Sequence, residues 1–315
     1  MTEGNAQDQR PADQVLVLVA RPGAARLDDE LLAQVAQPLA MFHAELRWLE
    51  EQGRTAAEIA FSPPPPSHYN PRSLEDRTRR TLMGQPIDVA VLPLGGRRKK
   101  LLVADMDSTI IGQECIDELA AHAGVGEEVA EVTERAMRGE LNFRDALRER
   151  LRKLQGLPEG IIDEVIEQRI CVNNGAEVLV RTMKAHGART ALVSGGFTPF
   201  ARHVAEVVGF DYFRANALPT RDGKLTGEAA EPILGKDAKL ETMLALIEEM
   251  GISTRDVLAV GDGANDAAMI EAAGLGVAYH AKPVLEEVAD ARIRHNDLTA
   301  LLYLQGYRRD EFVAD

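Results

Sequence analysis

The chain has 315 residues, 45% of them hydrophobic and 27% charged, so it has room for two or three domains and a substantial core. The formal net charge of −14 argues against non-specific binding to nucleic acids or acidic membranes. There is no signal-peptide pattern and no apolar run of about 18 residues, so we expect a cytoplasmic protein without a membrane-spanning helix.

The N-terminal third of the chain predicts a small α+β domain. Residues 1–13 are polar and without periodicity, which predicts a disordered tail. Residues 14–94 predict the order β-α-β-β-α-β, with strands at 15–20, 45–50, 55–62 and 87–92, helices at 27–40 and 73–83, and a polyproline spacer at 63–66. Ser73 is the expected N-cap of the second helix. This order is the split βαβ pattern of ferredoxin-like folds, and it resembles the ACT-like regulatory domains.

The second part of the chain predicts a doubly wound parallel sheet with an inserted cap. A linker is expected at 95–100, because two glycines and four basic residues follow one another there. Strand signals then alternate with amphipathic helices, at 101–104, 191–193, 257–260 and 276–279. Residues 113–175 contain helical patterns and no strand, and a turn at 221–224 predicts a short antiparallel flap. We therefore expect a core of 101–112 and 176–305, a helical cap of 113–175, and a tail of 306–315.

Two carboxylates follow the first strand of this sheet directly. Asp105 and Asp107 are two residues apart, so in an extended segment they lean toward the same side. Two such anions repel one another, and a bound cation or a proton on one of them makes the pair tolerable. Ser108 and Thr109 then supply hydroxyl groups. Taken alone, this stretch could equally be an acidic turn at the end of a strand, and the later motifs decide between the two interpretations.

Three later stretches place further polar groups at similar points. Ser194 and Gly195 end a strand just before a helix, where a hydroxyl and backbone N–H groups suit an anion. The run Gly261–Asp266 places two acids, two glycines and an amide after a buried strand, which is costly without a cation. Lys239 lies on a predicted helix between these stretches. By itself it would be an ordinary solvated lysine, and its place in the order of the motifs draws attention to it.

In this order, DxDST, SGG, Lys and GDGxND resemble the haloacid dehalogenase superfamily over roughly residues 99–300. The resemblance implies a Rossmann-type core and phosphoryl transfer, with Asp105 as the nucleophile and Asp107 as the general acid and base. It also implies a Mg²⁺ ion held by Asp105, the backbone carbonyl of Asp107, and Asp262, with Asp266 in support. The remaining implied roles are phosphate binding by Ser108, Ser194, Gly195 and Lys239, and orientation of the bound substrate by Asn265.

A second resemblance concerns the substrate. The stretches 114–120, 139–143 and 193–197 look like those of phosphoserine phosphatases, which would make O-phospho-L-serine the substrate and place the reaction last in L-serine biosynthesis. This resemblance implies that Glu114 receives the substrate ammonium and Arg150 its carboxylate, with Met137 and Phe143 as apolar lid residues. On their own, Glu114 could be an acid favoured at a helix N-terminus, and Arg150 part of a surface ion pair, for example with Asp145.

Several alternatives stay open at this point. The core could act on another small phosphate ester, or transfer phosphate to an alcohol other than water. The protein could instead be an amino-acid-sensing regulator with a vestigial core, although the intact motifs speak against this. The N-terminal domain could dimerise, bind L-serine as an effector, or do neither. We expect a homodimer formed largely through this domain, and an active fragment starting near Arg97, because ferredoxin-like units have sheet edges that pair readily.

Overall fold

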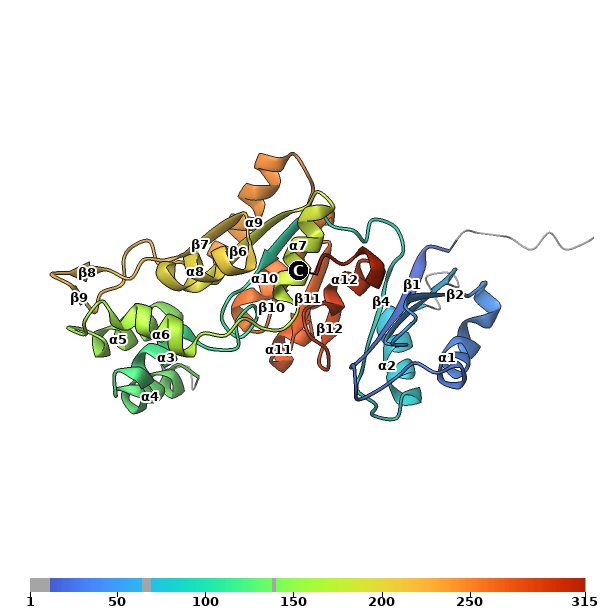
Figure 1. Cartoon of the computed structure of the whole chain (residues 1–315), viewed down its shortest axis with the longest axis horizontal. Helices are drawn as coiled ribbons and strands as arrows, with labels where there is room; N and C mark the ends of the chain where they lie inside the picture. Colours follow the sequence, from blue (N-terminus) through green and yellow to red (C-terminus); the bar gives the residue numbers. More distant parts are fainter. Residues whose placement is uncertain (1–11, 64–68, 138–139, 315) are drawn as a thin grey trace, which may run out of the picture. The chain divides into compact units, whose positions relative to one another are not determined.

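The structure is a computed structural model that describes residues 12–63, 69–137 and 140–314. It contains two compact units (Figure 1). Unit 1 extends to Arg98 and also contains 293–296 and 300–311, whereas unit 2 contains Lys99 to Arg292 with 297–299 and 312–315. Most of the predicted tail, and residues 64–66 of the predicted polyproline spacer, lie outside the described residues. In the described part of the chain, no helix is both long and apolar enough to cross a membrane.

Unit 1 is built around a four-stranded antiparallel sheet in the order β2-β3-β1-β4. Its elements are β1 (Gln14–Ala20), α1 (Asp29–Ala36), β2 (Glu45–Glu50), β3 (Ala56–Phe61), α2 (Pro71–Thr81) and β4 (Ile87–Pro93). This confirms the predicted β-α-β-β-α-β order and the ferredoxin-like arrangement. One face of the sheet forms a core with the helices, in which Leu16 and Leu18 of β1 pack with Leu32 and Val35 of α1.

Both helices of unit 1 have bounds that differ from the prediction. Helix α1 ends at Ala36 and continues as a 3₁₀ turn, because Pro38 has no N–H with which to extend the α-helical ladder. The predicted N-cap of α2, Ser73, is wrong: the cap is Asn70. Its side chain accepts hydrogen bonds from the backbone N–H groups of Arg72 and Ser73 at 2.9 and 3.3 Å. Proline at the first helical position suits this cap, since that position needs no N–H.

The opposite face of the unit 1 sheet is covered by a segment from the far end of the chain. Helix α12 (Ala300–Leu304) is buried along its whole length and contacts β1. Asp88 of β4 is 4% exposed and accepts hydrogen bonds from the backbone N–H and the side-chain Nδ2 of Asn296, at 3.1 and 2.9 Å. The same Nδ2 donates to the carbonyl of Val19 at 2.8 Å. The structure therefore groups residues 300–305 with the N-terminal sheet, whereas the sequence analysis assigned them to the catalytic core.

This grouping changes what we expect of a fragment that starts at Arg97. All predicted catalytic residues lie in unit 2, so the fragment should still release phosphate. However, Leu301, Leu302 and Leu304 would lose the sheet that buries them, and each exposed leucine costs about 1.5–3 kcal/mol. We expect a lower melting temperature than that of the full chain, together with binding of a hydrophobic dye.

A matched fragment that ends at Thr299 lacks α12 and should bind less of the dye. Melting by circular dichroism and dye fluorescence, measured on both fragments and the full chain, test this expectation. Equal melting temperatures and equal dye binding in all three proteins would contradict it.

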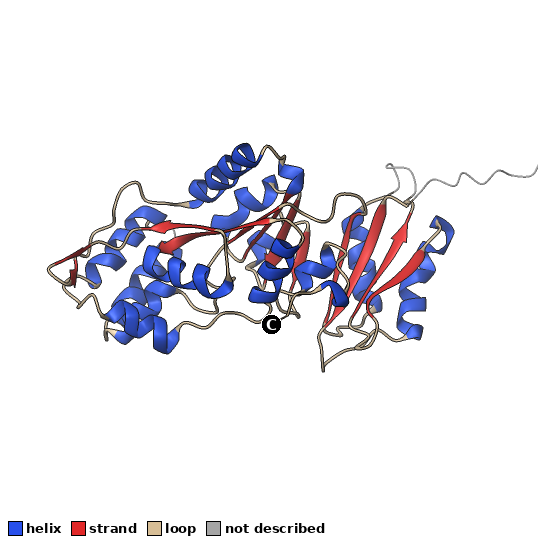
Figure 2. Ribbon diagram, turned by 45° about the horizontal axis from the view of Figure 1, so that its top comes forward, coloured by secondary structure: helices blue, strands red, loops and turns tan. Residues whose placement is uncertain are grey.

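Unit 2 is built around a six-stranded sheet in the order β12-β11-β10-β5-β6-β7 (Figure 2). The strands are β5 (Leu101–Ala104), β6 (Arg189–Phe197), β7 (Tyr212–Asn216), β10 (Val257–Gly261), β11 (Leu275–Tyr279) and β12 (Ala291–Ile293). Each neighbouring pair from β11 to β7 is parallel, which confirms the predicted doubly wound fold. The sequence analysis missed β7 and β12, because β7 is only half-buried at the sheet edge and β12 has three residues.

Helices surround this sheet and form the cap. The cap contains α3 (Cys115–His122), α4 (Gly126–Met137), α5 (Phe143–Lys153) and α6 (Ile161–Arg169). The core helices are α7 (Ala176–Ala185), α8 (Thr198–Val208), α9 (Lys236–Met250), α10 (Ala267–Ala272) and α11 (Pro283–Glu286). The predicted flap is present as the hairpin of β8 (Thr220–Arg221) and β9 (Lys224–Leu225).

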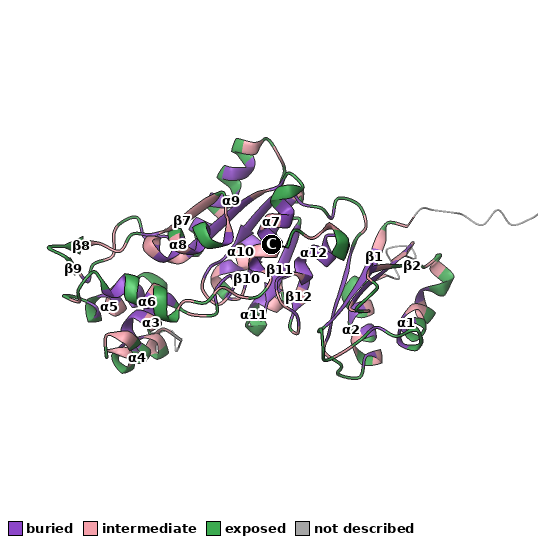
Figure 3. Cartoon of the chain, in the orientation of Figure 1, coloured by how far each residue is buried: buried purple, intermediate pink, exposed green. Residues whose placement is uncertain are grey.

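The central strands are buried throughout (Figure 3), and Leu101 and Val103 of β5 pack with Met243 of α9 and Met269 of α10.

Candidate active site

The carboxyl ends of three adjacent strands bring the predicted motifs together. Strand β5 lies between β6 and β10, and all three run parallel. Asp105 follows β5, Ser194 and Gly195 lie in the last part of β6, and Asp262 follows β10. Lys239 comes from the first turn of α9 and is buried. Motifs that are up to 160 residues apart in the sequence therefore meet at one edge of the sheet, where ligands bind in open α/β folds.

A cleft of about 530 Å³ opens at this edge, and both the core and the cap line it. Eight of the predicted residues line the cleft: Asp105, Asp107, Glu114, Phe143, Arg150, Gly195, Asp262 and Asn265. The sequence analysis did not single out the remaining lining side chains, which include Ile116 and Leu147 of the cap and Lys282 of the core. The cleft therefore combines an acidic core side with a mostly apolar cap side.

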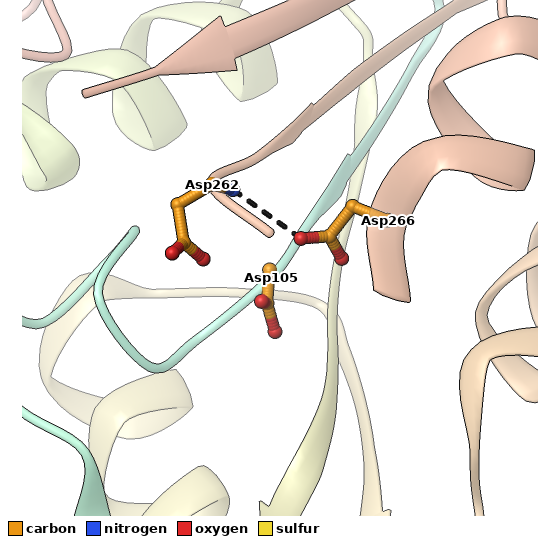
Figure 4. A group of neighbouring side chains, drawn as sticks. All are labelled: Asp105, Asp262 and Asp266. Atoms are coloured by element: carbon orange, nitrogen blue, oxygen red, sulfur yellow. Dashed lines mark hydrogen bonds between the residues drawn. The ribbon is translucent and has the colours of Figure 1, made fainter. Parts of the chain in front are cut away.

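Three aspartates form a cluster on the core side of the cleft. Asp105, Asp262 and Asp266 each offer one carboxylate oxygen, and these atoms lie within 4.8 Å of one another (Figure 4). The Nζ of Lys239 lies 2.7 Å from Oδ1 of Asp105 and 2.5 Å from Oδ1 of Asp266. Burial lowers the pKa of Lys239, but the two carboxylates raise it by more, so the lysine stays charged at neutral pH.

The charges of this cluster do not balance, since one lysine faces several carboxylates. Burial raises the pKa of Asp105 well above its usual range, the nearby Asp266 adds to the effect, and Lys239 opposes it. Burial also raises the pKa of Asp262 to about 6, with further contributions from Asp266 and Glu114. Close oxygen ligands with excess negative charge are what a hard divalent cation such as Mg²⁺ requires, so the residues present fit such an ion.

Asp266 has a supporting place in the cluster. It is fully buried, and both of its oxygens are engaged: Oδ1 pairs with Lys239, while Oδ2 accepts hydrogen bonds from the N–H groups of Asp262 and Gly263 at 3.2 and 3.1 Å. A Cβ at Gly261 would overlap this carboxylate, so a glycine is required there. Asp266 thus holds the loop that presents Asp262.

Asp107 lies between the cap and the last residues of β6. Its Oδ1 accepts a hydrogen bond from the N–H of Cys115 at 3.2 Å, and its Oδ2 lies 3.4 Å from Oγ of Ser194. Burial raises the pKa of Asp107 to about 6, and Glu114 contributes to the rise. A carboxyl group with such a pKa can both give and take a proton near neutral pH. A Cβ at Gly196 would come within 2.6 Å of Oδ2, so glycine also permits this close approach.

The cap contributes two opposite charges to the cleft. Glu114 is the N-cap residue of α3, and its Oε1 accepts a hydrogen bond from Oγ of Ser108 at 2.7 Å. Arg150 of α5 is half-buried and, within the described part of the chain, makes no ion pair; Asp145 pairs with Arg148 instead. Burial lowers the pKa of Arg150, while nearby carboxylates oppose the shift. The sequence also allowed Arg150 to form a surface ion pair, but it forms none with the described residues.

The other predicted residues have the following places. The Ser108 hydroxyl donates a hydrogen bond to Glu114. Ser108 is not one of the described residues that line the cleft. Phe143 is 42% exposed, and its ring lies over Gly195, where a Cβ would be 3.5 Å from Cζ. Asn265 is half-buried beside Asp262. Met137 ends α4, and its side chain lies outside the described structure.

Asn216, the last residue of β7, was not among the predicted site residues. It is 4% exposed, and its Nδ2 donates to the carbonyls of Gly195 and Leu234 at 2.8 and 3.3 Å. Its Oδ1 accepts a hydrogen bond from the N–H of Leu234 at 2.7 Å. This side chain joins the last part of β6 to the segment that leads into α9. No sequence motif identifies Asn216 as a site residue, because its hydrogen-bond partners are backbone atoms of distant segments.

Comparison with known proteins identifies the family of the chain. Residues 99–274 match the haloacid dehalogenase-like hydrolase family. The chain is 45% identical over 227 residues to a phosphoserine phosphatase of Archaeoglobus fulgidus, covering 71% of this chain and 66% of that protein. It is 37% identical to a phosphoserine phosphatase of Mycobacterium tuberculosis, covering 97% of this chain and 74% of that protein.

A solved structure supports the same grouping. It is described as a phospho-aspartyl intermediate analogue of phosphoserine phosphatase, and it is 43% identical with a TM-score of 0.61. The match covers 65% of this chain and 98% of that one. The fold thus agrees with the matches in sequence and structure. The chain belongs to the haloacid dehalogenase-like hydrolases and, within them, to the phosphoserine phosphatase family.

Proposed function

We propose that this protein hydrolyses O-phospho-L-serine to L-serine and phosphate, the last step of L-serine biosynthesis, with Mg²⁺ as cofactor. The observation that carries the proposal is that Glu114 and Arg150 line the same cleft as Asp105 and Asp262. A phosphate ester that also bears an ammonium and a carboxylate group needs one acid and one base beside its phosphate site. The cleft contains both, on the cap side.

The reaction proceeds in two displacements. A carboxylate oxygen of Asp105 attacks phosphorus, and the bond between phosphorus and the seryl oxygen breaks while Asp107 protonates that oxygen. This step leaves an aspartyl-phosphate on Asp105. Asp107 then takes a proton from water, whose oxygen attacks phosphorus and releases inorganic phosphate from Asp105. The buried Lys239, the hydroxyl of Ser194 and the N–H of Gly195 would stabilise the phosphoryl oxygens.

We assign the metal to the aspartate cluster. Asp105 and Asp262 would hold Mg²⁺ together with the backbone carbonyl of Asp107. When bound, the ion supplies positive charge that offsets the carboxylates and the phosphoryl oxygens. Asp266 keeps the Asp262 loop and Lys239 in position through its two oxygens.

The cap residues account for the choice of substrate. Arg150 would bind the substrate carboxylate through two parallel N–H groups, and Glu114 would accept hydrogen bonds from the ammonium group. Phe143, over Gly195, would close the cleft above the phosphate and exclude water from the nucleophile. Met137 is proposed as a second apolar lid residue on the family resemblance alone.

The decisive test of the function is substrate profiling of the purified full chain. Phosphate release is measured with O-phospho-L-serine, O-phospho-L-threonine and several sugar phosphates, with Mg²⁺ and with excess EDTA. The proposal expects strong preference for phosphoserine and loss of turnover in EDTA. Preference for a sugar phosphate, or transfer to an added alcohol in place of water, would favour the alternative phosphotransferase. Absence of turnover on every substrate would favour a regulator with a vestigial core.

The N-terminal domain is proposed to be ACT-like and to hold a homodimer together. Strands β2 and β4 lie at the two edges of its sheet, and residues 45–47 of β2 are exposed. Such an edge can pair with its copy across a two-fold axis. Sedimentation of the full chain tests the dimer, and titration with L-serine tests whether this domain binds an effector. A monomeric full chain would overturn the dimer.

Asn216 is expected to position the phosphate-binding loop. In Asn216→Asp, a carboxylate would face the carbonyls of Gly195 and Leu234 and could not donate to them. Lost hydrogen bonds between buried groups cost about 1–3 kcal/mol each, so we expect kcat/KM to fall by about tenfold or more. The loss should appear in the KM for phosphoserine and in the inhibition constant of inorganic phosphate, since both depend on this loop.

Thr198→Ala is a matched control for this prediction. The Thr198 hydroxyl donates to the backbone carbonyl of Asn216 at 3.0 Å, so the control perturbs the same place without touching Gly195. Melting temperatures show how far each variant is destabilised. If both variants lost stability alike and phosphate inhibition were unchanged, Asn216 would have a purely structural role.

A further inference from the structure

A second cavity, in unit 1, is lined by arginines. It has a volume of about 400 Å³, and its lining residues are Arg47, Leu94, Gly96, Arg97, Arg98, Gln305 and Gly306. Among the described residues, no acidic side chain lines it, although the chain as a whole has a net charge of −14. Three guanidinium groups around one concavity create a local positive potential on an acidic protein.

Two of these arginines share one buried carboxylate. Glu58 of β3 is 3% exposed; its Oε2 accepts a hydrogen bond from Nη2 of Arg97 at 2.8 Å, and its Oε1 accepts one from Nε of Arg47 at 2.8 Å. One negative charge therefore faces two positive charges. Glu58 also fixes the position of both guanidinium groups.

Arg97 has a further unsatisfied group. Its side chain is 8% exposed, and its buried Nη1 finds no hydrogen-bond partner among residues 12–63, 69–137 and 140–314. A buried donor without a partner is destabilising and requires an explanation, such as a bound ion. Gly306 makes room for the guanidinium, since a Cβ there would come within 2.6 Å of Nη2.

The third arginine is held at the edge of the same cavity. Nη2 of Arg98 lies 2.7 and 2.9 Å from the carboxylate oxygens of Glu311, and its guanidinium lies over the ring of Tyr307 at 4.1 Å. Arg98 remains 45% exposed and Arg47 53% exposed. With Glu58 and Glu311 counted, the group keeps one uncompensated positive charge.

We propose that this cavity binds a small oxyanion, a phosphate or a carboxylate, distinct from the substrate of the active site. The planar forks of Arg47 and Arg98 would contact its oxygens directly, and Arg97 would stabilise it from its buried position. The anion would balance the remaining positive charge of the three guanidinium groups. The proposal is independent of the proposed function, since it uses only unit 1.

Equilibrium dialysis of radiolabelled inorganic phosphate with the full chain tests the proposal. The wild type is expected to bind one more phosphate per chain than Arg97→Gln; with a second phosphate in the active site, as the proposed function expects, the totals are two and about one. Arg98→Gln should weaken the second site by about tenfold or more. Arg77→Gln, an exposed arginine on α2 away from the cavity, removes the same charge and should keep both phosphates.

Two further measurements keep the test decisive. Arg97→Gln could unfold unit 1 by leaving Glu58 with one partner, so the double variant of the half-exposed Arg47 and Arg98, each to Gln, is measured beside it. Competition by acetate, against chloride at equal ionic strength, shows whether carboxylates are accepted; no competition assigns the site to phosphate. Equal phosphate binding by wild type and all variants, or an equal loss in Arg77→Gln, would overturn the proposal.

Discussion

Replacement of Asp105 by asparagine is expected to abolish phosphate release from O-phospho-L-serine. The amide has the shape of the carboxylate but cannot form the aspartyl-phosphate, and it also removes the charge that faces Lys239 at 2.7 Å. Loss of a catalytic nucleophile lowers turnover by roughly 10³-fold or more. Stopped assays of released phosphate measure the loss, and acid-quenched samples with labelled substrate should show phosphoenzyme in the wild type alone.

Asp163→Asn is a suitable control for this variant, because Asp163 is exposed on cap helix α6 and does not line the cleft. Both variants should melt close to the wild type if folding is unaffected. Unchanged turnover in Asp105→Asn would rule out the proposed nucleophile. Phosphoenzyme formation by the Asp105→Asn variant would point to a different residue.

Arg150→Ala and Glu114→Gln are expected to damage turnover of phosphoserine far more than turnover of p-nitrophenyl phosphate. Both residues line the cleft from the cap side and are proposed to bind only the amino-acid end of the substrate. Loss of one partner from a desolvated charge pair costs about 2–5 kcal/mol, or about 30- to 5,000-fold in kcat/KM. The ratio of kcat/KM values for the two substrates measures the effect.

Arg148→Ala provides the comparison on the same helix. Arg148 pairs with Glu231 at 2.6 Å and does not line the cleft, so its loss should leave the substrate ratio unchanged. Arg150→Lys keeps the charge but loses the planar fork, and should recover part of the activity. An equal fall for both substrates in Arg150→Ala would make the residue structural and remove the main support for the substrate assignment.

The sequence by itself was sufficient to predict the catalytic fold and the charged residues at the centre of the cleft. Apolar strands that end in short polar motifs predict a parallel sheet, and in such a sheet the motifs must share one edge. For this reason Asp105, Asp107 and Asp262 could be assigned to one site before any coordinates. The ferredoxin-like order of unit 1 could also be predicted from the sequence, because the hydrophobic residues of each strand and helix follow the periodicity of that element.

Other features were decided by the tertiary structure alone. Asn216 binds backbone atoms of segments about 20 residues away, and backbone atoms leave no trace in a sequence motif. The C-terminal helix α12 is apolar on all sides, so its sequence cannot show which unit buries it, and the structure places it with the N-terminal sheet. The unsatisfied Arg97 and its neighbours meet only because residues 47, 97 and 306 fold together. Periodicity encodes which residues are buried, whereas the partner across a buried surface depends on the packing of the whole chain.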